Sequence, residues 1–225
     1  MTANHALGSE VSPPGDNPFV TRAIRSGMVP FFFPPGESLR GLVERLRDHH
    51  WRGQIVGPHG SGKSTLLASL LPEIAEQAGE VAVARLFVGC RRLPSEFQST
   101  GCFRRPAGGT RVFLIDGYEQ LPPWRRGRLQ RRCLHAGAGL LVSTHHALLG
   151  LPVLYQTQVT AETAWRVVTH LMPTQGAGLT RERVAALLAS HAGDVRELLF
   201  ELYDWYEEHG SRTDFQSVRN RAWTD

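Results

Sequence analysis

Short apolar runs alternate with longer amphipathic segments over most of the chain. The runs are separated by glycine, proline and charged residues, a pattern typical of strands buried in a sheet. The expected strands are Gln54–Val56, Val81–Val88, Val112–Ile115, Gly139–Val142 and Val153–Tyr155.

The segments beside these runs carry apolar residues at helical spacing or are long enough for a helix. The expected helices are Ser38–His50, Ser64–Gln77, Pro94–Ser99 with an irregular extension, and Leu121–Ala136. Residues 101–109 contain glycine and proline and are expected to form a loop. Strands that alternate with such crossovers predict an α/β fold, a five-stranded parallel sheet with helices on both faces.

After the fifth run the pattern changes to consecutive helices. They are expected over Thr160–Met172, Thr180–His191 and Asp194–His209, the first two capped by their threonines. The chain therefore divides into four predicted parts. These are a flexible leader over residues 1–18, an α/β core over 19–158, a small helical lid over 159–210 and a disordered tail over 211–225.

A glycine-rich segment joins the first expected strand to its helix. It reads Gly57-Pro58-His59-Gly60-Ser61-Gly62-Lys63-Ser64, then Thr65, and matches the phosphate-binding P-loop pattern G-x-x-x-x-G-K-[ST]. Glycines let backbone N–H groups surround an anion without Cβ clashes, and a helix N-terminus favours negative charge. Gly57 to Thr65 are therefore expected to bind nucleotide phosphates, with the Ser64 hydroxyl on Mg²⁺. The alternative is a glycine-rich turn that matches by chance.

Composition strengthens this interpretation at one residue. Lys63 is the only lysine in the sequence, and every other basic side chain is arginine. A compact ammonium on a flexible stem reaches between phosphate oxygens where a planar guanidinium fits poorly. The retained lysine therefore marks Lys63 as a phosphate ligand.

A second motif follows some 50 residues later. After Arg111, Val112 to Ile115 form a run of four apolar residues that ends in Asp116, a pattern that resembles the Walker B strand, whose aspartate holds Mg²⁺. A strand that ends in an ordinary turn aspartate before Gly117 would look the same.

With these two motifs the chain resembles the AAA+ and related STAND-type ATPases over roughly residues 38–209. The resemblance implies an ASCE-type P-loop sheet and ATP with Mg²⁺. Gly193-Asp194-Val195-Arg196 resembles the sensor 2 segment, which makes Arg196 the lid arginine expected to reach the γ-phosphate. Leu141 to Thr144 resemble the sensor 1 strand, with Thr144 as the polar residue that positions water and Ser143 as the second choice. A strand that simply ends in polar residues is the alternative for Thr144.

The chain departs from the family at the position after Asp116. That position usually carries the catalytic glutamate and is Gly117 here. Glu119 is the candidate base if Gly117 permits a tight turn, although it is also a plausible first residue of a helix. Arg131 and Arg132 lie where the family often places an arginine finger that acts on a neighbouring subunit.

Several function classes remain open or are excluded. With one lysine there is no N-K-x-D guanine-specificity motif, and no L-S-G-G-Q segment is present, so ATP is expected and an ABC-type ATPase is not. The leading hypothesis is an AAA+-like ATPase that works as a switch or motor for a partner protein or for its own assembly. A nucleotide or small-molecule kinase and a non-hydrolysing ATP-binding scaffold are the alternatives.

Charge and cysteine content add limits. The net charge of +4 and the scattered arginine clusters leave nucleic-acid binding possible but not indicated. Three cysteines without C-x-x-C spacing and no apparent signal peptide predict a reducing cytoplasm. No apolar run approaches the roughly 20 residues that span a bilayer.

Overall fold

The structure is a computed structural model. It describes residue 19 and residues 29–97, 101–103, 106, 108–172 and 179–221, with the side chains of 96 and 209–221 left out. The expected leader, apart from its end near Phe19, lies outside these residues.

Five parallel strands form one sheet in the order β2-β3-β4-β1-β5. Their bounds are β1 Arg52–Val56, β2 Gly79–Arg85, β3 Thr110–Asp116, β4 Gly139–Thr144 and β5 Val153–Gln156. Because all pairings are parallel, the carboxyl ends of the strands share one edge of the sheet. The first strand lies inside the sheet, between β4 and the outer strand β5, so the loop that follows β1 lies at that edge beside the ends of both strands.

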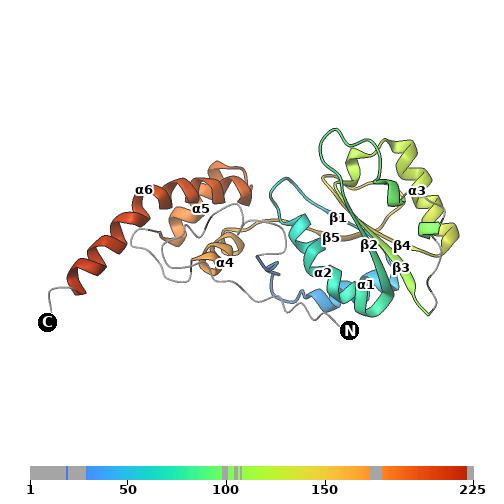
Figure 1. Cartoon of the computed structure of the whole chain (residues 1–225), viewed down its shortest axis with the longest axis horizontal. Coiled ribbons are helices and arrows are strands. Elements are labelled where there is room, and N and C mark those ends of the chain that lie inside the picture. The colour runs from blue at the N-terminus through green and yellow to red at the C-terminus, as the bar shows by residue number, and fades with distance from the viewer. Residues whose placement is uncertain are drawn as a thin grey trace.

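Alternate residues of β3 send their side chains to opposite faces of the sheet. Val112 and Leu114 belong to a buried cluster with α1 (Leu39–Asp48) and α2 (Lys63–Ala78). Phe113 and Ile115 belong to a second cluster on the other face, where α3 (Pro123–Ala136) packs. Figure 1 shows α1 and α2 below the sheet and α3 above it. Three short 3₁₀ turns, η1 Ser95–Phe97, η2 Gly101–Phe103 and η3 Tyr118–Gln120, complete this part.

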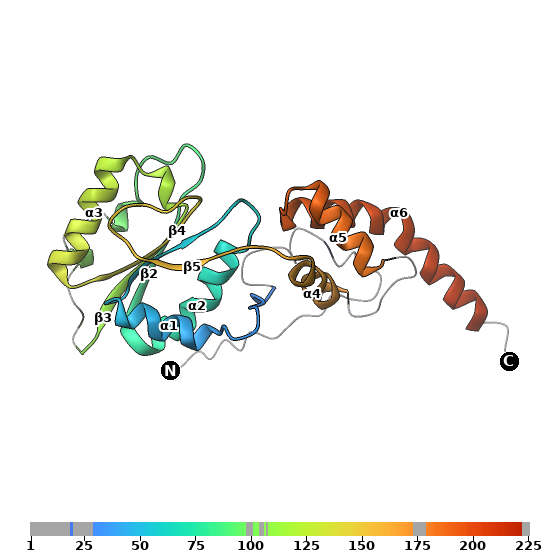
Figure 2. The ribbon, with the colours of Figure 1, turned by 180° about the vertical axis from the view of Figure 1, so that it is seen from behind.

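Three helices form the lid, which lies beside the sheet (Figures 1 and 2). They are α4 Ala161–Leu171, α5 Arg181–Ser190 and α6 Val195–Arg221. Thr160 and Thr180 cap α4 and α5, each accepting a hydrogen bond from the N–H three residues on, because threonine side chains satisfy the free donors of a first turn. Ala164, Val184, Leu198 and other apolar residues of the three helices form a third buried cluster.

The fold class predicted from the sequence is confirmed, and several details differ. The helix expected over Pro94–Ser99 is only the short 3₁₀ turn η1 among the described residues. The second strand ends at Arg85, and Val88 lies 89 % exposed beyond it. Phe19, assigned to the start of the core, packs instead into the lid cluster against Tyr206.

A further difference is the length of α6. Its backbone stays helical to Arg221, although a disordered tail was expected from Ser211. No proline interrupts residues 195–221, and a helix once formed gains one hydrogen bond for each residue that it adds. The sequence prediction looked for an apolar face, which helix propagation does not require.

Candidate nucleotide-binding site

A cavity of about 590 Å³ opens at the carboxyl edge of the sheet. Its wall combines the P-loop after β1, the end of β3, the end of β4, the segment 29–32 and the start of α6. Ligands of open parallel sheets bind at this edge, so the cavity is the candidate functional site.

The P-loop curves around one side of this cavity, from His59 to Thr65. Gly60 and Gly62 have φ of 62° and 88°, a left-handed conformation that favours glycine. A Cβ on Gly60 would lie 1.7 Å from an Asp194 carboxylate oxygen, so this position has no room for a side chain. Because α2 begins at Lys63, the free N–H groups of its first turn lie at the cavity.

Gly57 and Pro58 do not line the cavity but hold Lys63. The Lys63 ammonium donates to the Gly57 carbonyl at 2.7 Å and to the Pro58 carbonyl at 2.5 Å. Burial lowers the pKa of Lys63, while the carboxylates of Glu119, Asp116 and Asp194 oppose that shift. The cation is therefore held at the cavity wall next to negative charge, where an anionic ligand would find it.

Asp116 and Ser143 face the cavity from neighbouring strands. The Ser143 hydroxyl donates to Asp116 Oδ1 at 2.5 Å and accepts from the Gly117 N–H at 2.9 Å. Arg85 Nε lies 3.3 Å from the other Asp116 oxygen, because Arg85 is the register partner of Asp116 on β2. Asp116 and the Ser64 hydroxyl thus supply oxygen donors in one cavity, the type that Mg²⁺ prefers.

The structure corrects the choice between Ser143 and Thr144. Thr144 is fully buried, does not line the cavity and has its hydroxyl 3.5 Å from the Gln54 side-chain oxygen. Successive residues of a strand point to opposite faces, so only one of the two can face the site. Ser143 is the residue that faces the cavity. The sequence alone did not show which of the two alternating sets of strand residues faces the site.

The turn at Gly117 brings the Glu119 carboxylate into the cavity, three positions after Asp116 instead of directly after it. Gly117 has φ of 76°, and a Cβ there would lie 2.4 Å from the Leu86 carbonyl oxygen. A glutamate therefore does not fit directly after Asp116. The chain turns through η3 instead, and Glu119 lines the cavity. Its Oε2 is buried and has no hydrogen-bond partner among the described residues.

Two histidines adjoin Glu119. His145 Nδ1 lies 3.4 Å from Glu119 Oε1, and the His145 ring lies 3.9 Å, centre to centre, from that of His59 in the P-loop. Burial lowers the pKa of His145, and Lys63, His59 and His146 lower it further, while Glu119 raises it. The imidazole is therefore mostly neutral near pH 7, and its charge is sensitive to what binds beside Lys63.

The lid reaches the cavity through the first turn of α6. Asp194 Oδ1 accepts hydrogen bonds from the N–H groups of Arg196 at 2.8 Å and Glu197 at 3.4 Å, so Asp194 caps this helix. The same carboxylate lies against Gly60 of the P-loop. Arg196, predicted from the sequence as the lid arginine, lines the cavity.

Sequence reasoning missed two buried polar residues that position loops at the ends of the strands. The buried Thr157 hydroxyl, just after β5, lies 2.6 Å from that of Ser61 and ties the P-loop to the segment that leads to the lid. Gln54 is buried within β1, and its amide nitrogen donates to the carbonyls of Leu148 and Leu151. Isolated polar residues in or after a strand give no sequence signal for such roles. Arg131 and Arg132 do not line the cavity.

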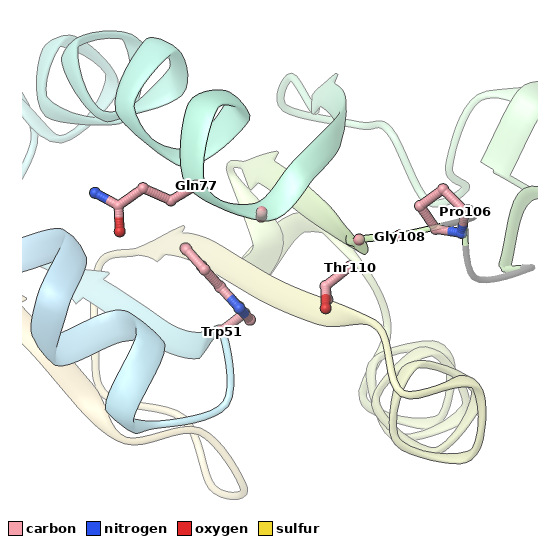
Figure 3. Close-up of a pocket in the computed structure, with 7 residues that line it drawn as sticks. Trp51, Gln77, Pro106, Gly108 and Thr110 are labelled. Carbon is pink, nitrogen blue, oxygen red and sulfur yellow. The ribbon is translucent and has the colours of Figure 1, made fainter.

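A second hollow of about 550 Å³ lies at the opposite edge of the sheet. Figure 3 shows Trp51, Gln77, Pro106 and Thr110 around it. None of the described residues that line it carries an ionisable side chain, so it offers no comparable chemistry. No group of three or more potential metal-ligating residues was found in the described part of the chain. None of the described helices is both long and apolar enough to span a bilayer.

Comparison with protein-family models and with curated proteins found no match. Among solved structures, the chain is similar to domain III of the Thermotoga maritima replication initiation protein DnaA. The sequence identity is 14 %, the TM-score is 0.51, and the match covers 80 % of this chain and 88 % of that one. A DNA replication initiation factor matches at 14 % identity and a TM-score of 0.50, over 81 % of this chain and 66 % of that one. AMPPCP-bound DnaA from Aquifex aeolicus matches at 15 % identity and a TM-score of 0.49, over 84 % and 68 %.

The first two similarities, together with the strand order and the P-loop, define the class of fold. The chain has the AAA+ type of P-loop NTPase fold, as its motifs predicted.

Proposed function

We propose that the chain binds ATP with Mg²⁺ and hydrolyses it, and that the nucleotide state is passed on through the helical lid. The observation that carries this proposal is that the P-loop, Asp116 with Glu119, and Arg196 line a single cavity although they come from three separate parts of the sequence. A chance match to the P-loop pattern would not bring the other three residues to it.

One group of residues binds the phosphates and Mg²⁺, and Glu119 takes part in the reaction. The N–H groups of His59 to Thr65 bind the phosphates, and Lys63 exchanges its bonds to the loop carbonyls for phosphate oxygens. Ser64 and Asp116 hold Mg²⁺, which neutralises phosphate charge when bound. Asp116 is already oriented by Ser143 and Arg85.

Glu119 is the proposed general base. Water attacks the γ-phosphorus, one of its protons passes to the Glu119 carboxylate, and the bond to the bridging oxygen of ADP breaks. The unpartnered Oε2 supports this role, because a buried carboxylate oxygen without a donor favours an incoming O–H. The contact with His145 holds the other oxygen.

Arg196 and Asp194 give the lid its sensitivity to the nucleotide. The Asp194 carboxylate lies against the loop that binds phosphate, so a bound phosphate repels it, while Arg196 two residues further along is attracted. The two charges favour a shift of the lid on binding, which a partner protein or a second copy can detect.

Phosphate release separates this proposal from its alternatives. Wild-type protein should release phosphate from ATP without an acceptor, and Glu119→Gln should lower the rate at least about 100-fold while ATP still binds. Ser143→Ala should lower the rate more than Thr144→Val, because only Ser143 contacts Asp116. Turnover that requires an added acceptor would support a kinase. ATP binding with no turnover in any variant would support a scaffold.

Whether the nucleotide state changes assembly or partner binding is tested by measuring the mass of the protein in solution with and without nucleotide. The proposal predicts a larger particle, or a captured partner, with ATP and Mg²⁺ than without nucleotide. Lys63→Ala should remove the difference. A monomer that is the same under all conditions and captures no partner would contradict the switch, although not nucleotide binding itself.

A further inference from the structure

A row of exposed side chains follows one face of α3. Trp124, Arg128, Arg131 and His135 have the spacing i, i+4, i+7 and i+11, which places them on one side of a helix, and all four are exposed. We call these four residues the α3 stripe. At 1.5 Å per residue the stripe is about 16 Å long. The helix α3 lies on the side of the sheet opposite α1 and α2, away from the lid (Figure 1).

The charged residues along the chain on both sides of the stripe have one sign. Residues 120–161 contain no aspartate or glutamate, whereas α3 contains five arginines. None of the ion pairs found among the described residues includes Arg125, Arg126, Arg128 or Arg131.

Replacement of lysine by arginine throughout the chain does not explain this distribution. Such a bias changes the kind of cation but leaves acidic partners in place. On α1 those partners are present, because Arg40 pairs with Glu44 and Arg45 with Glu37. Between Val195 and Glu208, α6 carries five acidic residues and one arginine. A cluster of five arginines in a stretch of chain without acidic residues is therefore a local property of α3.

An aromatic ring stands at the start of this basic helix. Trp124 is 61 % exposed, and the Arg125 guanidinium stacks over its ring at 4.4 Å. A tryptophan this exposed leaves a large apolar surface in water. Aromatic rings beside arginines are the arrangement on which proteins stack the unpaired bases of single strands.

We propose that the α3 stripe binds single-stranded nucleic acid, with Arg128 and Arg131 on phosphates and Trp124 stacked on a base. The stripe does not contribute to the cavity, so this proposal stands independently of ATP binding. The absence of acidic residues favours a polyanion over a protein surface of mixed charge.

The test measures binding of fluorescently labelled single-stranded DNA and RNA oligonucleotides by anisotropy over a series of salt concentrations. Arg128→Gln/Arg131→Gln should weaken binding and reduce the slope of log K against log salt by about 1.4, at about 0.7 for each phosphate contact. The matched control is Arg40→Gln/Arg47→Gln, which removes the same charge from exposed positions of α1 and should leave the slope unchanged. Trp124→Ala should weaken binding by about ten-fold with the slope retained.

Three outcomes would overturn the proposal. The first is an equal loss of oligonucleotide affinity in the α3 and α1 double variants, which would indicate that binding depends only on the net charge of the protein. The second is a duplex that binds more tightly than a single strand of the same length, with no effect of Trp124→Ala. The third is self-association, seen by sedimentation, that Arg128→Gln/Arg131→Gln abolishes while no oligonucleotide binds, since the basic helix would then contact a second copy. Binding retained in Lys63→Ala separates the stripe from the nucleotide cavity.

Discussion

At the scale of single residues, the end of β3 determines where the carboxylates of the site lie. Asp116 stays in the sheet, next to Ser143, while Gly117 reverses the chain so that Glu119 returns to the same cavity. A residue with a side chain at 117 would have both an unfavourable φ and a clash with the Leu86 carbonyl. The departure from the usual order of aspartate and glutamate therefore has a steric cause.

Replacing Gly117 tests this cause. Gly117→Ala should lower the free energy of unfolding by about 2 kcal/mol or more, because alanine at φ 76° is strained and its Cβ meets backbone. Gly127→Ala is the control, since Gly127 lies within α3 with nothing near its missing Cβ and should gain up to about 1 kcal/mol. Urea unfolding of both variants measures the difference, and equal stabilities would contradict the steric argument.

His145 should titrate below the usual histidine value of about 6.5. Burial and the nearby Lys63 lower its pKa, and Glu119 raises it. Glu119→Gln should therefore lower the His145 pKa further, and Lys63→Ala should raise it. Imidazole NMR signals, assigned with His145→Gln, measure all three values. A wild-type pKa above 6.5 would contradict the burial of the neutral ring.

The same shift has a consequence for stability. Because the folded pKa is lowered, the unfolded chain binds this proton more readily, so the unfolding free energy falls as the pH decreases from about 6.5 toward the folded value. His145→Gln should reduce the loss of stability over this range in urea unfolding experiments.

At the scale of elements, two contacts fasten the lid to the P-loop. The Ser61 and Thr157 hydroxyls meet where β5 leaves the sheet, and Asp194 joins the start of α6 to Gly60. An aromatic segment adds a third connection. Phe31 lies against Gly62, and the Phe32 ring lies beneath the Arg166 guanidinium of α4 at 4.6 Å. These contacts link the P-loop and the segment beside it to the chain after β5, to α4 and to the start of α6.

Asp194 should have separable effects on helix stability and on nucleotide affinity. Asp194→Asn keeps a capping oxygen, whereas Asp194→Ala removes it and should cost about 1 kcal/mol of stability. Both variants remove negative charge beside the phosphate site, so both should bind ATP more tightly than wild type. Thermal unfolding and an ATP titration measure the two effects. Weaker ATP binding by Asp194→Asn would show that the carboxylate assists the ligand instead of opposing it.

At the scale of the whole molecule, local signals predicted most of the fold. The strands appeared as short apolar runs with segments of helical length beside most of them, and the P-loop is contiguous, so β1, α2 and Lys63 could be placed from sequence. The contacts that complete the site join distant positions. His59 meets His145, and Gly60 meets Asp194, only after the sheet and lid have formed. The choice of Ser143 over Thr144 likewise depends on the phase of a buried strand, which an all-apolar run does not reveal.

Calorimetric titration with ATP and Mg²⁺ tests the central claim most directly. Wild-type protein should bind one ATP per chain, Lys63→Ala should bind at least about 100-fold more weakly, and the exposed α1 variant Arg47→Ala should bind like wild type. Affinity of Lys63→Ala equal to that of wild type, or no heat of binding in the wild-type protein, would contradict a nucleotide site in this cavity.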